Sequence, residues 1–412
     1  MVDQKLYVNL PPMLAGTELL SALEVLPDYD ESIRNQDAAT RLMALSDLYK
    51  LYLPSQMSVE IYSKLYLALL RSLQKKQTSL AIHQQIQNYR AIHQQSYSGI
   101  IGGSDSFTII GASGIGKSTA ISRAISLITG NRIIEVEDPY TKIIPCLVVQ
   151  CPFDSSVKGL LLEILRKVDE YLGSKYYETA MRVRATTDML IGSVSQVALN
   201  HIGLLIVDEI QNVVNSKHGK SLVGMLTQLI NNSGISICMV GTPESTPFFE
   251  QAMQLARRSL GIQYGNMGYD TYFQEFCNVL FEYQYVRNDT ILTPDIAEWL
   301  YEHSAGIISV VVSLVHDAQE ISILNSKESL SLETLNMAYQ QRLSLLHGYI
   351  EPTTKKPQTT HTKKNAPATK ASADHEIVSP NLISELVTMV KNQQLDLVTV
   401  LMDYMPIVEV AI

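Results

Sequence analysis

Cysteine and tryptophan are scarce in this chain of 412 residues, which contains four cysteines and one tryptophan. The cysteines form no CxxC pair and stand at no histidine spacing of the zinc-site type, so nothing points to a zinc site. We expect them to be buried free thiols in a reducing compartment. They are Cys146, Cys151, Cys238 and Cys277.

Long apolar runs are also missing, since no uninterrupted stretch reaches the roughly 18 residues of a membrane span. The opening residues, Met-Val-Asp-Gln-Lys-Leu-Tyr, lack the charged-then-apolar layout of a signal peptide, so we expect a cytoplasmic protein without a membrane partner. The formal net charge is −9, which argues against a protein that coats nucleic acid by its overall field. A local basic stripe remains compatible with this charge.

Hydrophobic residues make up 46% of the chain, which is enough for a sizeable core. In residues 101–290, short apolar runs alternate with helical patterns. Buried strands separated by helices predict an α/β domain with a parallel five-stranded sheet. The strand-like runs are Phe107–Ile110, Cys146–Val149, Leu204–Val207, Ile235–Val240 and Val279–Tyr283. The helical patterns lie at roughly 117–129, 156–172, 180–199 and 218–231.

The segments that flank this domain differ from it in composition. Leucines at helical spacing predict an N-terminal helical region over 1–100, and helical periodicity predicts a small C-terminal helical lid over 291–350. Residues 351–380 are rich in Pro, Thr and Lys, which predicts a flexible linker. Residues 381–412 are strongly apolar for their length, so we expect this tail to bind a partner.

Residues 111–118, Gly-Ala-Ser-Gly-Ile-Gly-Lys-Ser, match the phosphate-binding pattern G-x-x-x-x-G-K-[ST] and stand between a predicted strand and a predicted helix. Backbone N–H groups of such a loop surround phosphate oxygens, and the helix N-terminus adds its dipole. Lys117 is placed to reach the β- and γ-phosphates of ATP, and the Ser118 hydroxyl to bind Mg²⁺. The predicted nucleotide-binding residues are Gly111, Ala112, Ser113, Gly114, Ile115, Gly116, Lys117, Ser118 and Thr119.

Two further strand ends carry polar residues. The apolar run 204–207 ends in Asp208-Glu209, which predicts a carboxylate beside the metal followed by one that polarises an attacking water. Thr242 follows another apolar run and is a candidate sensor of the γ-phosphate, although a simple turn before Pro243 is the alternative. These residues predict an ATPase.

Arg257 and Arg258 follow on a predicted helix without acidic neighbours in the sequence. One interpretation is an arginine finger that reaches the γ-phosphate bound to a neighbouring subunit, which makes hydrolysis depend on assembly. The alternative is a solvated helix face.

Three segments taken together resemble the TnsC/TniB family, the AAA+ regulator ATPases of TnsC-dependent and CRISPR-associated transposons. They are His-Ile-Gly-Leu-Leu-Ile-Val-Asp-Glu-Ile-Gln-Asn at 201–212, Val-Gly-Thr-Pro-Glu at 240–244 and Gln-Leu-Ala-Arg-Arg at 254–258. The resemblance covers about residues 40–345 and implies a P-loop AAA+ ATPase fold. In one departure from many AAA+ proteins, the lid sequence 304–309 has a serine where a sensing arginine is expected.

The resemblance also implies a function, an ATP-dependent regulator of DNA transposition. Such a protein assembles on double-stranded DNA as a homo-oligomeric ring or filament and links a target-selector protein of the TniQ/TnsD type to a transposase of the TnsA/TnsB type. Slow, assembly-dependent ATP hydrolysis then controls assembly and disassembly. The N-terminal region is expected to face the target selector, and the tail to recruit the transposase. The implied catalytic residues are Glu209, Lys117, Thr242, Arg257 and Arg258, and the implied Mg²⁺ ligands are Ser118 and Asp208.

The best basic material for DNA contact lies between the predicted second strand and the Asp-Glu pair, a region from which AAA+ initiator-like proteins often line the DNA channel. No alternation of aromatic and basic residues indicates base stacking, so contacts to the DNA backbone are expected. The alternative is a solvated helix face of mixed charge. A corresponding alternative function is an AAA+ ATPase that remodels protein partners or signals through them without DNA. The candidate DNA-binding residues are Lys158, Lys175, Arg182 and Arg184.

Overall fold

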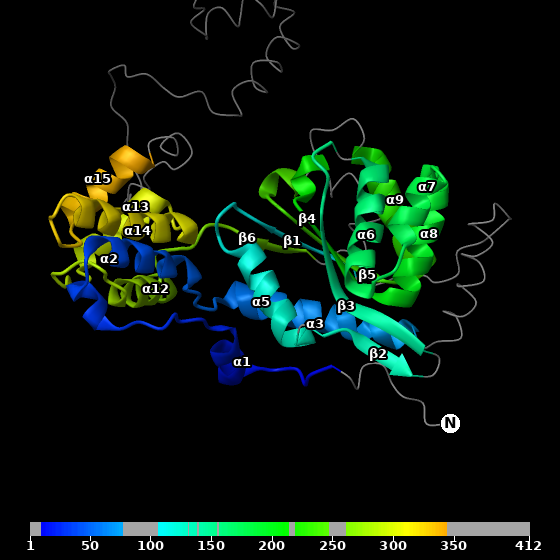
Figure 1. The fold of residues 1–412 in the computed structure, drawn as a ribbon, viewed down its shortest axis with the longest axis horizontal. Coiled ribbons are helices and arrows are strands. Elements are labelled where there is room, and N and C mark those ends of the chain that lie inside the picture. Colours follow the sequence, from blue (N-terminus) through cyan, green and yellow to red (C-terminus); the bar gives the residue numbers. More distant parts are fainter. Residues whose placement is uncertain are drawn as a thin grey trace, which may run out of the picture. The chain divides into compact units, whose positions relative to one another are not determined.

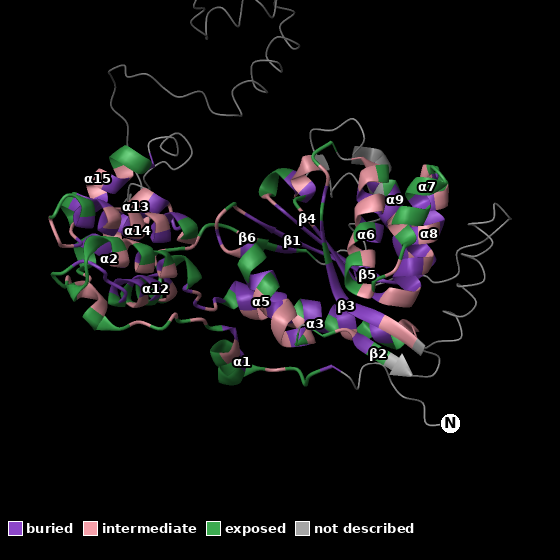
Figure 2. Cartoon of the chain, in the orientation of Figure 1, coloured by how far each residue is buried: buried purple, intermediate pink, exposed green. Residues whose placement is uncertain are grey.

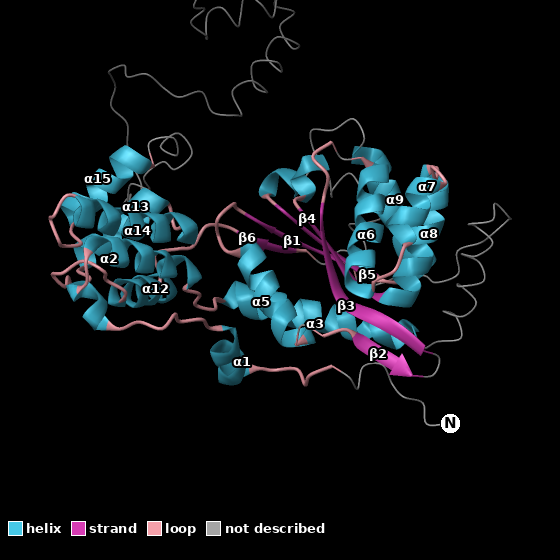
Figure 3. Ribbon diagram, in the orientation of Figure 1, coloured by secondary structure: helices cyan, strands magenta, loops and turns pink. Residues whose placement is uncertain are grey.

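The computed structural model of the protein describes residues 10–76, 106–130, 132–137, 140–154, 156–213, 219–246 and 261–343. Figure 3 shows these residues as helices, strands and loops. The predicted linker at 351–380, the predicted tail at 381–412 and the arginines Arg257 and Arg258 lie outside the described residues.

A six-stranded sheet runs through the centre of the region between residues 107 and 264 (Figure 1). The strands lie in the order β2-β3-β4-β5-β1-β6, and all neighbouring pairs are parallel except β2 and β3. This confirms the predicted α/β fold with a mostly parallel sheet. Four of the five predicted strands are present, the fifth parallel strand is instead β6, and β2 adds an antiparallel strand at an edge. The strands are β1 (Phe107–Gly111), β2 (Ile134–Glu137), β3 (Tyr140–Gln150), β4 (Ile202–Asp208), β5 (Ser236–Gly241) and β6 (Ile262–Tyr264).

The register of the parallel strands brings their carboxyl ends to one edge of the sheet. Ile110 of β1 lies opposite Gly241 of β5, and Gln150 of β3 lies opposite Asp208 of β4. Ligands of open parallel sheets bind outside this carboxyl edge. The edge is therefore the place to look for a site.

Alternate side chains of a central strand enter two different cores. On β4, Leu204 and Ile206 join the apolar cluster formed with α1, α3 and α5, whereas Leu205 and Val207 join the cluster formed with α6, α8 and α9. This alternation of period two explains why a strand buried on both faces reads as a continuous apolar run. Figure 1 shows α6, α8 and α9 on one side of the sheet and α3 and α5 on the other. The covering helices are α1 (Gly16–Leu23), α3 (Gln56–Lys76), α5 (Lys117–Thr129), α6 (Val157–Leu172), α8 (Thr187–His201) and α9 (Gly219–Ser233).

The helix predicted over roughly 180–199 is divided in the structure. A short helix, α7 (Tyr176–Arg182), ends before residue 183, and α8 begins at Thr187. The break has a local cause, because the side chain of Thr186 accepts a hydrogen bond from the Met189 N–H and caps α8.

The C-terminal helices form a separate apolar core built from α12 (Thr271–Glu282), α13 (Pro294–Ser304), α14 (Ile308–Leu324) and α15 (Leu332–Arg342). The strand predicted at Val279–Tyr283 is wrong, because residues 279–282 complete helix α12. Phe273, Phe276, Cys277, Leu280 and Phe281 are buried at helical spacing, and the carboxylate of Asp270 caps the helix.

The N-terminal helices contribute to two cores rather than one. Leu45 of α2 (Ala38–Leu45), Leu48 of the 3₁₀ helix η3 (Ser46–Lys50) and Leu51 lie in the core of the C-terminal helices. Helix α3, which begins at Gln56, packs against α5 and the sheet. Figure 2 shows buried residues in both groups of helices. The chain thus crosses from one core to the other within a few residues around Leu53.

A buried arginine ties α2 to the C-terminal helices. The guanidinium of Arg41, whose side chain is 1% exposed, forms two hydrogen bonds of 2.7 and 2.8 Å with the carboxylate of Glu328. It also donates to the carbonyl oxygen of Tyr285 at 3.0 Å. These bonds from Arg41 hold the pKa of Glu328 below its usual range. The pair connects segments that lie far apart in the sequence.

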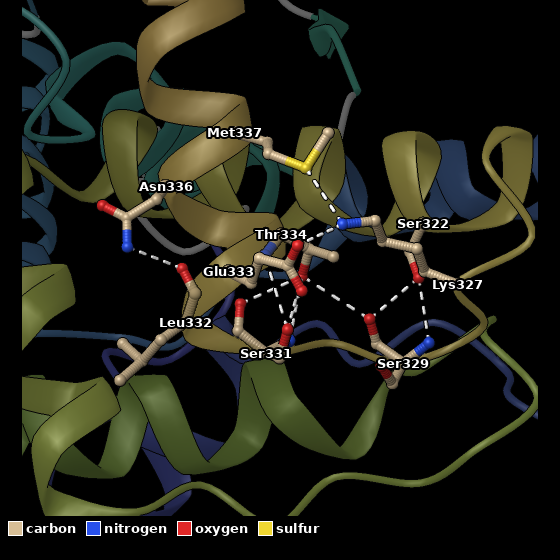
Figure 4. A network of polar contacts seen from close by, with 9 residues as sticks. All are labelled: Ser322, Lys327, Ser329, Ser331, Leu332, Glu333, Thr334, Asn336 and Met337. Atoms are coloured by element: carbon tan, nitrogen blue, oxygen red, sulfur yellow. Dashed lines mark hydrogen bonds and ion pairs between the residues drawn. The ribbon is translucent and has the colours of Figure 1, made fainter.

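The turn that presents Glu328 is itself fixed by a polar network (Figure 4). The Ser322 hydroxyl donates to the carbonyl oxygen of Ser329 at 2.8 Å and accepts from its N–H at 2.9 Å. Ser331 and Thr334 form a reciprocal capping box at the start of α15. Glu328 has a φ of +55°, a backbone conformation that these contacts help to maintain.

All four cysteines are buried and free, as the sequence predicts. Burial raises the pKa of Cys146 and of Cys277 to about 12, so these thiols stay protonated at neutral pH. Both side chains lie in apolar cores.

The tryptophan of this chain stands on α13. The ring of Trp299 stacks on that of His303, with centroids 3.9 Å apart and planes inclined by 15°, and Tyr339 of α15 meets both rings edge-on.

Among the described residues no single helix has the length and hydropathy of a membrane span. Helices α13 and α14, which are bent by 120° at their junction, meet these two criteria only as a pair.

Candidate functional site

The phosphate-binding loop leaves β1 and enters α5 directly, as its chemistry requires. Gly114 and Gly116 have φ values of +80° and +95°, a region in which residues with a Cβ are strained. The carbonyl of Gly116 accepts the first hydrogen bond of α5, from the N–H of Ala120 at 2.9 Å. The loop therefore adopts the backbone path that turns N–H groups towards a bound anion.

Lys117 is buried at the start of α5. Its ammonium group donates to the carbonyl oxygens of Gly111 and Ala112, both at 2.7 Å. Burial lowers the pKa of Lys117, whereas the carboxylates of the Asp-Glu pair and of Glu244 raise it in opposition. The amine is thus held at the phosphate loop and faces an acidic strand end.

Ser118 and Asp208 form a pair of oxygen ligands. The Ser118 Oγ lies 3.5 Å from Asp208 Oδ2. Two oxygens that each stand about 2.1 Å from one Mg²⁺ ion in octahedral geometry are separated by about 3.0 Å when adjacent and about 4.2 Å when opposite. The observed separation lies between these two values, so the two oxygens need to approach by a few tenths of an ångström to become adjacent ligands of one Mg²⁺ ion. A hydroxyl with a carboxylate is a donor set that this ion accepts.

Glu209 follows at the tip of β4, with its backbone in the left-handed region at φ +59°. Its N–H donates to Asp208 Oδ1 at 2.8 Å, and its side chain accepts a hydrogen bond from the amide of Gln211. The Glu209 residue is exposed. A strained backbone at a polar strand end is typical of functional sites.

Thr242 stands at the tip of β5, beside the strand that carries the phosphate loop. Its N–H donates to Gln211 Oε1 at 3.3 Å. The Thr242 Oγ1 atom is buried without a hydrogen bond of normal geometry, although the side chain lies close enough to Glu244 to lower the pKa of that carboxyl. The hydroxyl thus lies beside Glu244 without contact to solvent, and it must turn towards the strand end to meet a ligand there.

A polar cavity brings these predicted residues together at the carboxyl edge of the sheet. Three residues that were not among the predicted site residues also line it, Gln211, Gly241 and Ser309. Gln211 belongs to the resemblance segment at 201–212, but nothing local assigned it a role. The full lining comprises Ser113, Gly114, Gly116, Lys117, Ser118, Thr119, Asp208, Glu209, Gln211, Gly241, Thr242 and Ser309.

An apolar pocket adjoins the polar cavity and shares residues of the phosphate loop and Ser309 with it. The N-terminal segment supplies Leu51, Tyr52 and Leu53, and α14 supplies Ile308 and Val312. A flat apolar ligand group attached to a phosphate chain fits such a neighbouring pair of pockets. Of the predicted nucleotide-binding residues, Ile115 lines this pocket rather than the polar cavity.

The helical lid touches the phosphate loop. The N–H of Ser309, in the first turn of α14, donates to the carbonyl oxygen of Gly114 at 3.1 Å. A Cβ at Gly114 would stand 2.3 Å from the Ser309 hydroxyl oxygen, so the close approach needs glycine there. The serine at the lid position is thus in direct contact with the loop.

The four candidate DNA-binding residues are all exposed. Lys158 lies in the first turn of α6, whereas Lys175 precedes α7, Arg182 is its last residue and Arg184 follows it. Arg182 pairs with Glu178 at 2.9 Å. Within the described residues the other three basic side chains form no ion pair, which leaves their charge available.

These features define the class of protein. The sheet carries a phosphate loop after β1 and an Asp-Glu pair after β4, and strand β5 lies between these two strands. Together with the helices C-terminal to the sheet, these features are typical of a P-loop ATPase of the AAA+ type. Residues 101–263 match the model of the family described as bacterial TniB protein. The match covers less than half of the chain, so it shows that this segment is similar to the TniB family.

Three solved structures to which this chain is similar share little sequence with it. The Orc1 protein of Aeropyrum pernix in complex with DNA is 15% identical, with a TM-score of 0.41 over 64% of this chain and 64% of that chain, which is less than two thirds of its length. The Orc2 protein of Aeropyrum pernix in its ADP form is 17% identical, with a TM-score of 0.40 over 63% and 67%. A structure on katanin self-assembly is 15% identical, with a TM-score of 0.36 over 80% and 95%. No curated protein matches the sequence.

Proposed function

We propose that this protein is an ATP-dependent regulator of DNA transposition that assembles on double-stranded DNA as a ring or filament. It links a target-selection protein of the TniQ/TnsD type to a transposase of the TnsA/TnsB type, and ATP hydrolysis controls its assembly and disassembly. One observation carries the proposal: a single cavity within the segment that is similar to the TniB family holds the phosphate loop, the carboxylate pair and the strand-tip threonine.

The residues of the cavity have separate roles in the binding and hydrolysis of ATP. Loop N–H groups and Lys117 bind the β- and γ-phosphates, and the adjoining apolar pocket takes the base. Ser118 and Asp208 hold Mg²⁺, which supplies positive charge against the phosphate oxygens. Glu209 accepts a proton from the attacking water, and Thr242 hydrogen-bonds the γ-phosphate.

Assembly completes the site in this proposal. One of Arg257 and Arg258 reaches the γ-phosphate of a neighbouring subunit, so that hydrolysis is slow until subunits associate. The N-terminal region faces the target selector, and the tail at 381–412 recruits the transposase. An acidic chain can bind DNA in this way because each subunit adds a few phosphate contacts, which the assembly multiplies.

Negative-stain electron microscopy tests the proposal on the full chain, with duplex DNA and a non-hydrolysable ATP analogue, with DNA and ADP, and with DNA alone. We expect rings or filaments only with DNA and the ATP analogue. A Lys117→Ala variant should lose them under all conditions, because the phosphates lose their cation. Discrete particles that ignore DNA and nucleotide would instead favour an ATPase that acts on protein partners.

The exposed basic residues beside α7 allow a second test of the proposed DNA binding. An Arg184→Glu variant should bind duplex DNA about tenfold more weakly at low salt, and the dependence of its affinity on salt should be shallower, because one phosphate contact per subunit is lost. Fluorescence anisotropy over a salt series measures both. A Lys64→Glu variant, which changes an exposed lysine on α3, is the matched control and should behave as wild type. Equal losses in the two variants would mean that the effect is one of net charge.

A further inference from the structure

The side-chain amide of Gln211 bridges two functional strand ends. Its Nε2 donates to Glu209 Oε2, at the end of β4, and its Oε1 accepts the N–H of Thr242, at the end of β5, at 3.3 Å. The residue lines the polar cavity. One side chain therefore contacts both the proposed base and the backbone of the proposed phosphate sensor.

The chemistry of the two partners fixes the orientation of this amide. A carboxylate at Glu209 can only accept a hydrogen bond, and the backbone N–H of Thr242 can only donate one. The Nε2 atom must therefore face Glu209, and the Oε1 atom must face Thr242. Side chains of similar length do not offer both groups, since an ionised glutamate lacks the donor and methionine has only a weak sulfur acceptor.

The surrounding backbone is built to hold the bridge. Gln211 lies in the 3₁₀ helix η4 (Ile210–Val213), in which Ile210 is fully buried. The side chain of Asn212 donates to the carbonyl oxygen of Cys151 at 3.0 Å, which anchors the turn to the end of β3. A Cβ at Gly241 would stand 2.6 Å from Ile210 Cγ2 and 3.1 Å from Gln211 Oε1, so glycine there makes room for both.

We propose that Gln211 is a positioning residue that locks the Glu209 carboxylate to the tip of β5, so that the base and the phosphate sensor move as one unit. The bond to Oε2 leaves Oε1 of Glu209 free to accept a proton from water. Without the bridge, an exposed glutamate samples several rotamers, and the fraction in the productive one falls. A shift of Thr242 on phosphate binding is passed to Glu209 through one amide.

This inference rests on the proposed ATPase function, and steady-state ATP hydrolysis by the full chain in the presence of duplex DNA, on which the proposed assembly forms, tests it. In Gln211→Met, which removes both hydrogen bonds at similar size, kcat should fall about tenfold, whereas KM and the Kd of a fluorescent ATP analogue should stay within about twofold. Gln211→Glu keeps the acceptor for Thr242 but sets a second carboxylate against Glu209, so kcat should fall at least as far. Gln274→Met, at an exposed glutamine of α12, is the matched control and should leave kcat, KM and Kd unchanged.

The outcomes separate this inference from the proposed function. A wild-type kcat in Gln211→Met, or a loss of nucleotide affinity as large as its loss of kcat, would overturn the positioning role. A full kcat in Gln211→Glu would show that the donor to Glu209 is not needed. Failure of the proposed function looks different: the wild-type chain then hydrolyses no ATP, or Glu209→Gln hydrolyses it at the wild-type rate.

Discussion

A Glu209→Gln variant should bind ATP with wild-type affinity and hydrolyse it about 10³-fold more slowly. Removal of a general base costs roughly 10² to 10⁴ in rate. Binding should survive because the phosphate loop, Lys117 and the Ser118–Asp208 oxygen pair are unchanged, and glutamine preserves the size of the side chain. Phosphate release under single-turnover conditions, together with the Kd of a fluorescent ATP analogue, measures the two effects separately.

Two further variants make this result specific. Glu275→Gln changes an exposed carboxylate on α12 by the same single atom and should leave the rate unaltered. Asp208→Asn should instead weaken the Mg²⁺-dependent part of binding, since Asp208 faces Ser118 at 3.5 Å. A Glu209→Gln protein that turns over at more than a tenth of the wild-type rate would remove Glu209 from the role of base.

An Arg41→Leu variant should lose about 3 to 5 kcal/mol of folding free energy, because it leaves the Glu328 carboxylate and the Tyr285 carbonyl oxygen without their buried partner. For a domain of this size, the loss corresponds to a fall in Tm of roughly 10 °C. Thermal unfolding followed by circular dichroism, with wild type in parallel, measures it.

The matched control breaks a surface pair of similar distance. Lys50→Ala removes the contact with Asp47, in which the lysine side chain is 67% exposed, and should change stability by less than about 0.5 kcal/mol. A double variant, Arg41→Leu with Glu328→Leu, should recover part of the loss, since it also removes the Glu328 carboxylate, which in the single variant keeps only Arg287, with an ion pair of 3.8 Å and a backbone hydrogen bond. If the double variant is less stable than Arg41→Leu alone, the desolvated carboxylate is not the cause.

The sequence predicted those features whose residues lie close together along the chain. The phosphate loop and the Asp-Glu strand end are local patterns, and the long apolar helices follow from periodicity. It failed at Val279–Tyr283, because a short and largely apolar run looks the same as a strand or as the end of a buried helix. The aromatic residues upstream, with Asp270 as a cap, complete the helical pattern that the short window hid.

Other parts of the site depend on contacts between distant segments. The apolar pocket combines Leu51, Tyr52 and Leu53 with Ile308 and Val312, which stand more than two hundred positions apart. Gln211 gains its role only because β5 ends beside β4, and Ser309 only because α14 begins at the phosphate loop. No local motif encodes such neighbourhoods, so a single sequence gives no signal for them.

The stacked pair of Trp299 and His303 has an optical consequence. Because the chain contains one tryptophan, indole emission excited at long wavelength comes from α13 alone, with no background from the sheet domain. Emission intensity and anisotropy therefore follow the environment of the helical lid without any attached dye. Since α14 contacts the phosphate loop through Ser309, titration with nucleotide in a fluorimeter reads the response of the lid in real time.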